Sequence, residues 1–310
     1  MDFHNYKNNF NCSFMIGIIV NPYAGGGMSI KKLPYIKEYL DEKKLKYEIA
    51  ITEDKERGKE KFYGFLEKYE RIVFVGGDGT LNNSVQIGTK KRIDKTIGMI
   101  PTGSGNDFIR GLYEKKLNFK EYMEIAFFGK EKYVDAGILE KENEKIIFLN
   151  GCGFGIDSET AVKSEELRIF KGILRYLISL LIVLKNFKPI YVKIKTENFE
   201  YEGKITLIAF GNGKYIGGGF KLTPFADPFD GKIDFSIIKE LSKFKILKEL
   251  PKAVSGKHIY ESYSIYKNFS NFFEIEIKKP YNFHLDGEVY KIGEGKVYIK
   301  VVRNFLKFSI

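Results

Sequence analysis

The sequence predicts two domains: an α/β domain with a parallel sheet, followed by a mostly antiparallel, β-sandwich-like domain. Up to about Lys130, short apolar runs alternate with segments of helical periodicity, which is typical of parallel strands with helices on both faces of the sheet. After Lys130, short strand-like runs follow one another, with only two helical segments between them. Three glycine-bearing turns directly follow strands of the first part, at the carboxyl ends where parallel sheets bind ligands.

The first strand covers residues 16–20 and ends in the turn Asn21-Pro22-Tyr23-Ala24-Gly25-Gly26-Gly27. Ser29 is expected to cap the helix that follows, because a hydroxyl there can accept from the free N–H groups of the first turn. Helical spacing places four apolar residues of this helix on one face: Ile30, Leu33, Ile36 and Leu40. A second strand is predicted at residues 47–51 and ends at Thr52. In the charged helix after it, three side chains are expected to face the core: Phe62, Leu66 and Tyr69.

A buried strand at residues 72–75 stops abruptly at Gly76-Gly77-Asp78-Gly79-Thr80-Leu81-Asn82. The glycines allow positive φ and let the backbone approach a bulky ligand. Thr80 can cap a helix that starts at the next residue and runs to about residue 88, so the turn can cradle a phosphate at a helix N-terminus. Asp78 would repel a phosphate directly, which favours a metal ion between the two. A tight turn without a ligand is the alternative for this stretch alone.

The remaining elements follow the same two patterns. A fourth strand at residues 97–100 leads into Pro101-Thr102-Gly103-Ser104-Gly105-Asn106-Asp107, and a helix is predicted over residues 119–128. The strand-like runs of the second part are residues 133–139, 146–149, 190–195, 204–210, 233–238, 273–277 and 297–302, with helices near 167–184 and 244–254. The predicted boundaries are a disordered extension at 1–14, the α/β domain at 15–132 and the β-rich domain at 133–310. Met15, directly before the first strand, is an alternative translation start.

The composition is that of a globular protein with a net charge of +11. Its lysines are spread along the chain, so phosphates or an anionic membrane surface fit better than nucleic acid, for which no aromatic-plus-basic motif is present. Cys12, Cys152 and the three histidines show no metal-ligand spacing, which fits a reducing compartment. The longest apolar stretch, residues 173–184, is too short to span a bilayer, so it is expected in the core or against a membrane. The expected location is the cytoplasm.

Four motifs in order resemble the diacylglycerol kinase-like lipid kinase family, which also includes sphingosine and ceramide kinases. They are Asn21-Pro22-x-x-Gly25, the Gly76–Asn82 turn, the segment from Pro101 to Phe108, and Pro224-x-Ala226-x-x-x-Asp230-Gly231, with Asp286-Gly287-Glu288 later in the chain. NAD kinases share the central Gly-Gly-Asp-Gly-Thr turn, but the ordered set is far more specific. The resemblance covers nearly the whole chain from Met15 onward.

The resemblance implies that the three glycine turns bind ATP. The matching residues are Asn21, Pro22, Gly25, Thr52, Gly76, Gly77, Asp78, Gly79, Thr80, Asn82, Gly103, Ser104, Gly105, Asn106 and Asp107. Ser104 replaces the family's usual threonine and keeps the hydroxyl. Asn83 stands where a glutamate is common, so the function of that carboxylate is either missing here or supplied differently.

The resemblance also implies that Asp286 is the catalytic base. A lipid hydroxyl is a poor nucleophile until a positioned acceptor takes its proton, and a carboxylate beside a glycine leaves room for the substrate. Glu288, two residues later, would lie on the same face of a strand and could support the base or a metal. Without the resemblance, Asp286-Gly287 is better explained as a hairpin turn.

The acidic turn at residues 224–232 is expected to bind Mg²⁺, because hard cations prefer oxygen ligands. By resemblance, Asp230 supplies a carboxylate to this ion. Asp227 and Lys232 supply backbone carbonyls, and Asp78 lies nearby on the ATP side. A charged surface turn is the alternative.

The predicted function is that of an ATP- and Mg²⁺-dependent lipid kinase acting on a hydroxyl of a membrane lipid. Diacylglycerol is the first candidate acceptor, which would give phosphatidic acid. The enzyme would act peripherally at an anionic membrane surface, the inner membrane face, and a homodimer is the default assembly on base rates alone. An NAD kinase-type phosphotransferase and a catalytically silent nucleotide- or lipid-binding module remain open as alternatives.

Overall fold

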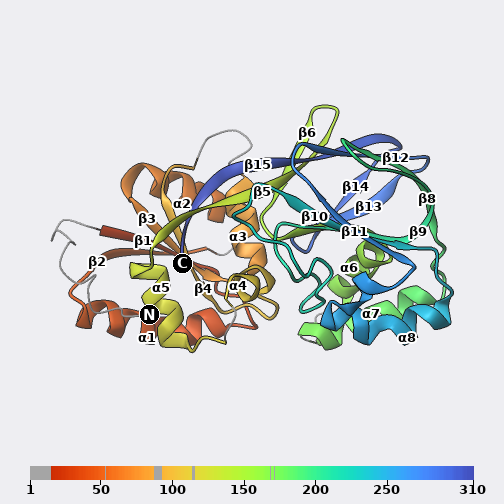
Figure 1. The fold of residues 1–310 in the computed structure, drawn as a ribbon. Helices are drawn as coiled ribbons and strands as arrows, with labels where there is room; N and C mark the ends of the chain where they lie inside the picture. The colour runs from red at the N-terminus through yellow and green to blue at the C-terminus, as the bar shows by residue number, and fades with distance from the viewer. Residues whose placement is uncertain (1–14, 53, 87–92, 114–115, 168, 171) are drawn as a thin grey trace.

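The computed structural model describes residues 15–52, 54–86, 93–113, 116–167, 169–170 and 172–310. The chain forms two halves that share one continuous sheet (Figure 1). The predicted extension at residues 1–14 and the predicted end of the helix near residue 88 lie outside the described residues.

Strands and helices alternate in the first half. Its elements are β1 (Met15–Val20), α1 (Met28–Glu42), β2 (Lys46–Ile51), α2 (Lys55–Lys68), β3 (Arg71–Gly76), α3 (Asp78–Val85), β4 (Thr96–Pro101), α4 (Asp107–Leu112) and α5 (Phe119–Phe128). The four strands pair in parallel in the order β2-β1-β3-β4. The chain order reverses between β1 and β3, and open α/β sheets bind ligands beside such a switch point.

Both faces of this parallel sheet are covered by apolar side chains, as the alternation of strands and helices predicts. Ile18 and Val73 belong to a core cluster with α1 and α5, whereas Ile19 and Phe74 belong to a second cluster with α2 and α3. The predicted α/β fold of this part is therefore confirmed, and the turns follow strands that are packed on both faces of the sheet.

The second half is a mostly antiparallel, sandwich-like assembly. Its strands are β5 (Glu131–Lys141), β6 (Glu144–Phe148), β7 (Gly151–Gly155), β8 (Ile190–Thr196), β9 (Glu200–Gly211), β10 (Ile233–Lys239), β11 (Ser264–Phe269), β12 (Phe272–Ile277), β13 (Tyr281–Leu285), β14 (Glu288–Ile292) and β15 (Gly295–Ser309). Its helices are α6 (Ile156–Glu166), α7 (Gly172–Leu184), α8 (Lys243–Ser255) and the 3₁₀ helix η3 (Lys257–Tyr260). Phenylalanines from five strands fill its main core: Phe154, Phe210, Phe235, Phe273 and Phe283.

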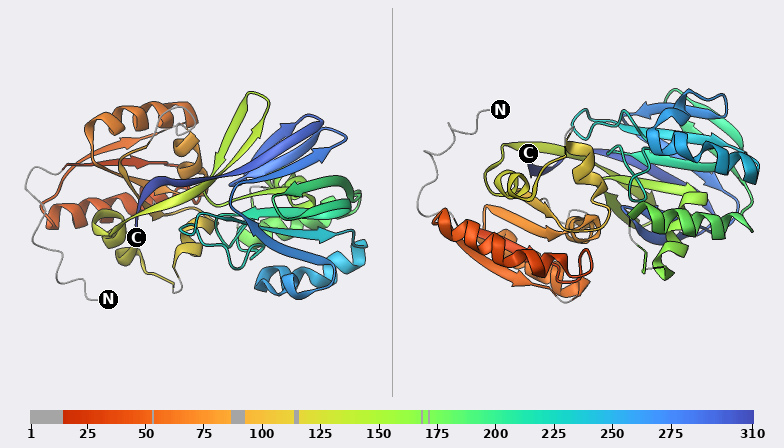
Figure 2. Two further views of the ribbon diagram at one scale, coloured as in Figure 1. Left: turned by 45° about the horizontal axis from the view of Figure 1, so that its top comes forward. Right: turned by 90° about the horizontal axis from the view of Figure 1, so that it is seen from below.

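Strands β5 and β15 run from one half to the other (Figures 1 and 2). β15 pairs in antiparallel fashion with β12 and β5, and its last residues then pair in parallel with β4, Lys307 opposite Thr96. Phe305, Leu306 and Phe308 of β15 are buried in the core cluster of the first half. The two halves are therefore joined by backbone hydrogen bonds as well as by side-chain packing.

Two predicted helix caps are wrong. Helix α1 begins at Met28, with Gly27 at the N-cap (φ 86°), and α3 begins at Asp78, with Gly77 at the N-cap. Both helices begin earlier than predicted, so the two hydroxyls lie inside the first turns and have other partners. Ser29 Oγ lies 2.6 Å from Thr102 Oγ1, and Thr80 Oγ1 accepts from the side chain of Asn21. The predicted inner face of α1 is also too wide, because Ile30 is 39% exposed.

The helix predicted near residues 167–184 corresponds to α7, which begins at Gly172, whereas α6, which precedes it, was not predicted. The sequence of α6 is mixed and polar, so it lacks the apolar periodicity that identifies α7. Strand β11 was also not predicted, because half of its side chains are polar. Both elements are stabilised by tertiary contacts rather than by a local pattern.

Candidate active site

The three glycine turns of the first half meet at the carboxyl ends of β1, β3 and β4. Gly25, Gly26 and Gly27 all have positive φ, and a Cβ on Gly25 would lie 2.0 Å from the carbonyl oxygen of Thr102. Only glycine allows the turn after β1 to pack so closely on the turn after β4.

Hydrogen bonds hold the three turns together. Asn21 Nδ2 donates to Thr80 Oγ1 at 3.0 Å, and the N–H of Thr102 donates to the Gly76 carbonyl at 2.7 Å. Gly77 and Gly103 pack backbone against backbone, since a Cβ on Gly103 would lie 2.6 Å from the Cα of Gly77. The structure thus brings the predicted nucleotide-binding turns into one surface: Asn21, Pro22, Gly25, Gly76, Gly77, Asp78, Gly79, Thr80, Gly103, Ser104, Gly105 and Asn106.

Thr52 and Asn82 lie at the edges of this turn surface. The N–H and hydroxyl of Thr52 both donate to the Val20 carbonyl, at 2.9 and 3.3 Å, so Thr52 joins the ends of β2 and β1. Asn82 is buried in α3 and its side chain donates to Asp286, which lies in the second half. Asn82 therefore connects the helix of the central turn to the predicted catalytic base.

Two carboxylates lie behind the turn after β4. Asp78 accepts from the N–H groups of Asp107 (2.9 Å) and Phe108 (3.2 Å) at the start of α4. The Asp107 carboxylate accepts from Gly218 N at 2.6 Å and from Arg110 Nη1 at 3.3 Å. Burial raises the pKa of Asp78, and burial together with the neighbouring Asp78 charge raises the pKa of Asp107 to about 7. The side chain of Asp107 is thus directed at the second half.

Asp286 lies in the turn between β13 and β14, with φ 49°. Its Oδ2 accepts from Asn82 Nδ2 (2.9 Å) and Leu149 N (2.8 Å), and its Oδ1 accepts from Asn150 N (2.9 Å) and Gly151 N (2.8 Å). Burial raises the pKa of Asp286, while these four hydrogen bonds oppose the rise because they favour the charged carboxylate. The carboxylate is therefore fixed in position, and burial leaves its pKa above the usual value for an aspartate.

Glu288 lies close to the central turn. Its Oε1 is 3.7 Å from the position that a Cβ on Gly79 would occupy. Asn83, at the position where a glutamate is common in the resembled family, donates from Nδ2 to the Gly79 carbonyl at 2.8 Å. Glu288 thus supplies a carboxylate beside the start of α3, although it comes from the other half of the chain.

The acidic turn at residues 227–232 exposes Asp227, Asp230 and Lys232, and its aspartate side chains accept hydrogen bonds from N–H groups of the same turn. Asp227 Oδ1 accepts from Phe229 N at 3.1 Å, and Asp230 Oδ1 accepts from Lys232 N at 2.9 Å. In the described part of the chain, no group of three or more His, Cys, Asp or Glu side chains is arranged to hold a metal ion. A site at this turn would therefore depend on Asp230, backbone carbonyls and water, which is a donor set that Mg²⁺ accepts.

Asp135 anchors this turn, and sequence reasoning missed it. Its Oδ2 accepts from Gly231 N and its Oδ1 from Asn304 N, both at 2.7 Å, and its own N–H donates to the Pro228 carbonyl at 2.8 Å. No local signal identifies this residue, because it lies inside strand β5 and its partners are far away in the sequence.

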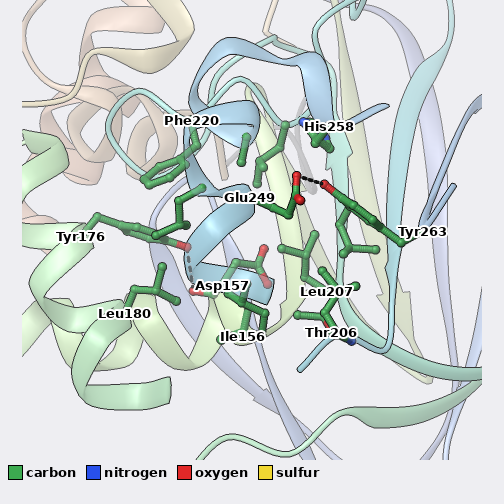
Figure 3. Close-up of a pocket in the computed structure, with 16 residues that line it drawn as sticks. Ile156, Asp157, Tyr176, Leu180, Thr206, Leu207, Phe220, Glu249, His258 and Tyr263 are labelled. Carbon is green, nitrogen blue, oxygen red and sulfur yellow. Dashed lines mark hydrogen bonds between the residues drawn. The ribbon is translucent and has the colours of Figure 1, made fainter. Parts of the chain in front are cut away.

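An apolar cavity of about 70 Å³ lies in the second half, between the sheet and helices α6, α7 and α8. Figure 3 shows Tyr176, Leu180, Leu207 and Phe220 among the side chains around it. The buried Asp157 is at its polar side, where its Oδ2 lies 3.0 Å from His284 Nε2 and its carbonyl accepts from the Tyr176 hydroxyl. This cavity was not predicted, because its walls come from residues between 156 and 263.

The outer faces of α7 and α8 carry exposed apolar side chains. They are Leu174, Leu181 and Ile182 on α7, and Phe244, Leu247 and Val254 on α8. The inner faces of both helices pack in one cluster around Leu180 and Ile246, so the exposed stripes point away from the sheet. None of the described helices is long and apolar enough to cross a bilayer.

Comparison with protein-family models gives two matches. Residues 15–139 match the diacylglycerol kinase catalytic domain, and residues 151–308 match the YegS C-terminal NAD kinase beta sandwich-like domain. The two models together include every residue of the turn surface, the acidic turn and Asp286.

Curated proteins and solved structures are similar to both halves. A probable lipid kinase YegS-like protein of Enterobacter sp. (strain 638) is 32% identical over 227 residues, 71% of each chain. A diacylglycerol kinase of Mycobacterium tuberculosis is 30% identical over 195 residues; the match covers 61% of this chain and 62% of that relative. A crystal structure titled as a diacylglycerol kinase from Bacillus anthracis str. Sterne superposes with a TM-score of 0.72 at 21% identity, over 95% of this chain and 96% of that one, which supports the fold.

Proposed function

Since the chain belongs to the family of diacylglycerol kinase-like lipid kinases, we propose that it is an ATP- and Mg²⁺-dependent lipid kinase. It transfers a phosphoryl group to a hydroxyl of a membrane lipid, with diacylglycerol as the first candidate acceptor. The observation that carries this proposal is the contact between Asn82 and Asp286. Through it, the helix that starts at the Gly76–Asn82 turn reaches the carboxylate that would take the acceptor's proton.

The turn surface fits a nucleotide because its glycines carry no Cβ, so the backbone of the three turns can come close to the phosphates. In the first turn of α3, the N–H groups of Thr80 and Leu81 donate to the Gly77 carbonyl, and Gly77 offers no side-chain cap to the N–H groups before them. Asn21, Thr80 and Ser104 would add polar side chains around the phosphates. ATP, when bound, supplies the phosphoryl group that is transferred. The protein's part is to orient it and to offset its charge, which is most of what this reaction needs.

Asp286 is proposed to accept the proton of the lipid hydroxyl. Each of its oxygens already accepts two hydrogen bonds, so the substrate hydroxyl has to replace one donor. The three main-chain donors are fixed by the backbone, whereas the amide of Asn82 can rotate about its side-chain torsions. We therefore assign Asn82 as the donor whose hydrogen bond to Asp286 is replaced when the lipid hydroxyl binds.

The acceptor's hydrocarbon is proposed to enter the apolar cavity under α7 and α8. A volume of 70 Å³ is less than half of the roughly 150 Å³ of a cavity that binds benzene, so an acyl chain needs these helices to move apart. Their exposed apolar stripes and the exposed lysines Lys243, Lys245 and Lys248 match an anionic membrane surface. The lipid would then pass from the bilayer into the cavity without crossing water.

Replacing Phe244 with glutamate is expected to weaken binding to vesicles of phosphatidylcholine with added phosphatidylglycerol by about tenfold. The phenyl ring is 78% exposed, and a charged carboxylate in its place cannot be buried in the membrane interface. Co-sedimentation with the vesicles measures this. Tyr35→Glu, at a 58% exposed ring on α1 of the other half, is the matched control and should leave binding unchanged. Equal losses in both variants would contradict docking through α7 and α8.

Asp230→Asn is expected to raise the Mg²⁺ concentration needed for half-maximal activity about tenfold or more, because the turn loses its charged ligand. Asp227→Asn is the control, since Asp227 is proposed to bind through its carbonyl only and its side chain already accepts from Phe229. Titration of the transfer rate with Mg²⁺ distinguishes the two. A larger effect in Asp227→Asn would show that the ligand assignment is wrong.

The test of the proposed function is transfer of γ-labelled phosphate from ATP, with Mg²⁺, to a panel of lipids in mixed micelles. Diacylglycerol, monoacylglycerol, a sphingoid base and phosphatidylglycerol are the lipid acceptors, and NAD is the soluble one. Label on a lipid supports the proposal and names the acceptor. Label on NAD alone, or ATP binding without transfer to any acceptor, would refute it.

A further inference from the structure

Asp107 closes the turn after β4, but its carboxylate points away from the turn surface. The residue is 5% exposed, and it binds Gly218 N and Arg110 Nη1 through different oxygens. Only its backbone N–H faces the central turn, where it donates to Asp78. Asp107 therefore joins a nucleotide-side turn to a loop of the second half.

The loop that Asp107 holds is a narrow turn whose ends pair with each other. Ile216 and Phe220 exchange two backbone hydrogen bonds, of 2.8 and 3.0 Å. Gly217, Gly218 and Gly219 form its tip, with φ of 69°, 82° and 133°. Because the tip has no side chains, its position depends on its backbone hydrogen bonds. The central glycine, Gly218, makes the bond to Asp107.

The same loop forms one wall of the apolar cavity. A Cβ on Gly217 would lie 2.9 Å from the ring of Tyr176, and the rings of Tyr176 and Phe220 are 5.0 Å apart. Both rings line the cavity (Figure 3). A shift of the glycine tip therefore has to move this pair of rings.

We propose that Asp107 is a positioning residue for the lipid acceptor and that its carboxylate is not a nucleotide ligand. It fixes the tip of the Ile216–Phe220 loop and, through the tip, the Tyr176–Phe220 wall of the cavity. This inference rests on the proposed lipid kinase function. Asp107 belongs to a motif on the nucleotide side, whereas its side chain is assigned to the lipid acceptor.

The test compares lipid and nucleotide parameters of Asp107 variants. Asp107→Ala leaves the Gly218 N–H without its side-chain acceptor, so the KM for the lipid is expected to rise about tenfold or more. The Kd for ATP, measured by calorimetry without lipid, should stay close to that of the parent, because the backbone N–H that binds Asp78 remains. Asp107→Asn keeps an oxygen for Gly218 and should restore most of the lipid KM.

Gly218→Ala disturbs the loop by a second route, in case Asp107→Ala folds poorly. At φ 82° a Cβ is strained, so the tip moves while Asp107 is intact, and the lipid KM should rise by more than the ATP Kd. Gly64→Ala is the neutral control, since no atom lies within 4 Å of its Cβ position.

Two results would overturn the inference. One is a rise in the ATP Kd that matches the rise in lipid KM; the other is an Asp107→Asn variant as impaired as Asp107→Ala, which would indicate a need for the charge itself. Failure of the proposed function is a different result, namely a parent protein that binds ATP and phosphorylates no lipid, and the inference then fails with it.

Discussion

Replacing Asp286 with asparagine is expected to lower the rate of phosphoryl transfer about 100- to 10,000-fold while ATP still binds. The amide cannot take the proton of the acceptor hydroxyl. Asp286 also lies in the turn between β13 and β14, outside the turn surface that would hold the nucleotide. Single-turnover transfer and calorimetric ATP binding, measured on the same preparation, check both parts of the expectation.

Loss of structure is the competing explanation for a slow Asp286→Asn enzyme. Asparagine offers one acceptor oxygen in place of two, so main-chain N–H groups at residues 149–151 lose partners, at a cost of about 1–3 kcal/mol each. Urea unfolding measures that cost. A variant that stays folded, binds ATP and transfers phosphate within tenfold of the parent rate would remove Asp286 from the role of base.

Gly25→Ala is expected to raise the KM for ATP by about a hundredfold and to destabilise the fold by about 2–4 kcal/mol. The added Cβ would lie 2.0 Å from the carbonyl oxygen of Thr102, so the turns after β1 and β4 have to separate. Their close packing is what makes the turn surface continuous. Steady-state kinetics and thermal unfolding of the variant measure the two effects.

Gly27→Ala is the matched control. Gly27 has an equally unfavourable φ of 86°, but the nearest atom to its Cβ position is 4.0 Å away. This variant therefore carries backbone strain without the clash, and a cost of about 1–2 kcal/mol with a small change in KM is expected. Similar ATP kinetics in the two variants would show that backbone strain, not contact between the turns, limits nucleotide binding.

The sequence predicts the parts of the site that are local. The strand, turn and helix start around Gly76–Asn82 are neighbours in the chain, so their order alone indicates an anion-binding turn. The errors at Ser29 and Thr80 have a local cause as well: each helix begins earlier, directly after a glycine, so both hydroxyls lie inside the first turn and join the turns to one another.

The parts assembled from distant segments were not predictable from pattern. Asp286 was identified by family resemblance, whereas its geometry depends on donors at residues 82 and 149–151. The orientation of Asp107 depends on a glycine 111 residues later in the chain. Neither a polar helix such as α6 nor an anchor such as Asp135 has a periodic signal, because what stabilises each is a tertiary contact.

The path of β15 also has a consequence for how the protein is made. The core that supports the nucleotide-side turns includes Phe305, Leu306 and Phe308, and the parallel sheet gains its last neighbour only when Lys307 pairs with Thr96. A ribosome synthesises these residues after nearly all of the second half. The first half therefore cannot complete its core during translation, and contacts this distant in sequence slow folding. We expect the halves to fold as one cooperative unit, with the aggregation-prone edge of β4 exposed until β15 arrives.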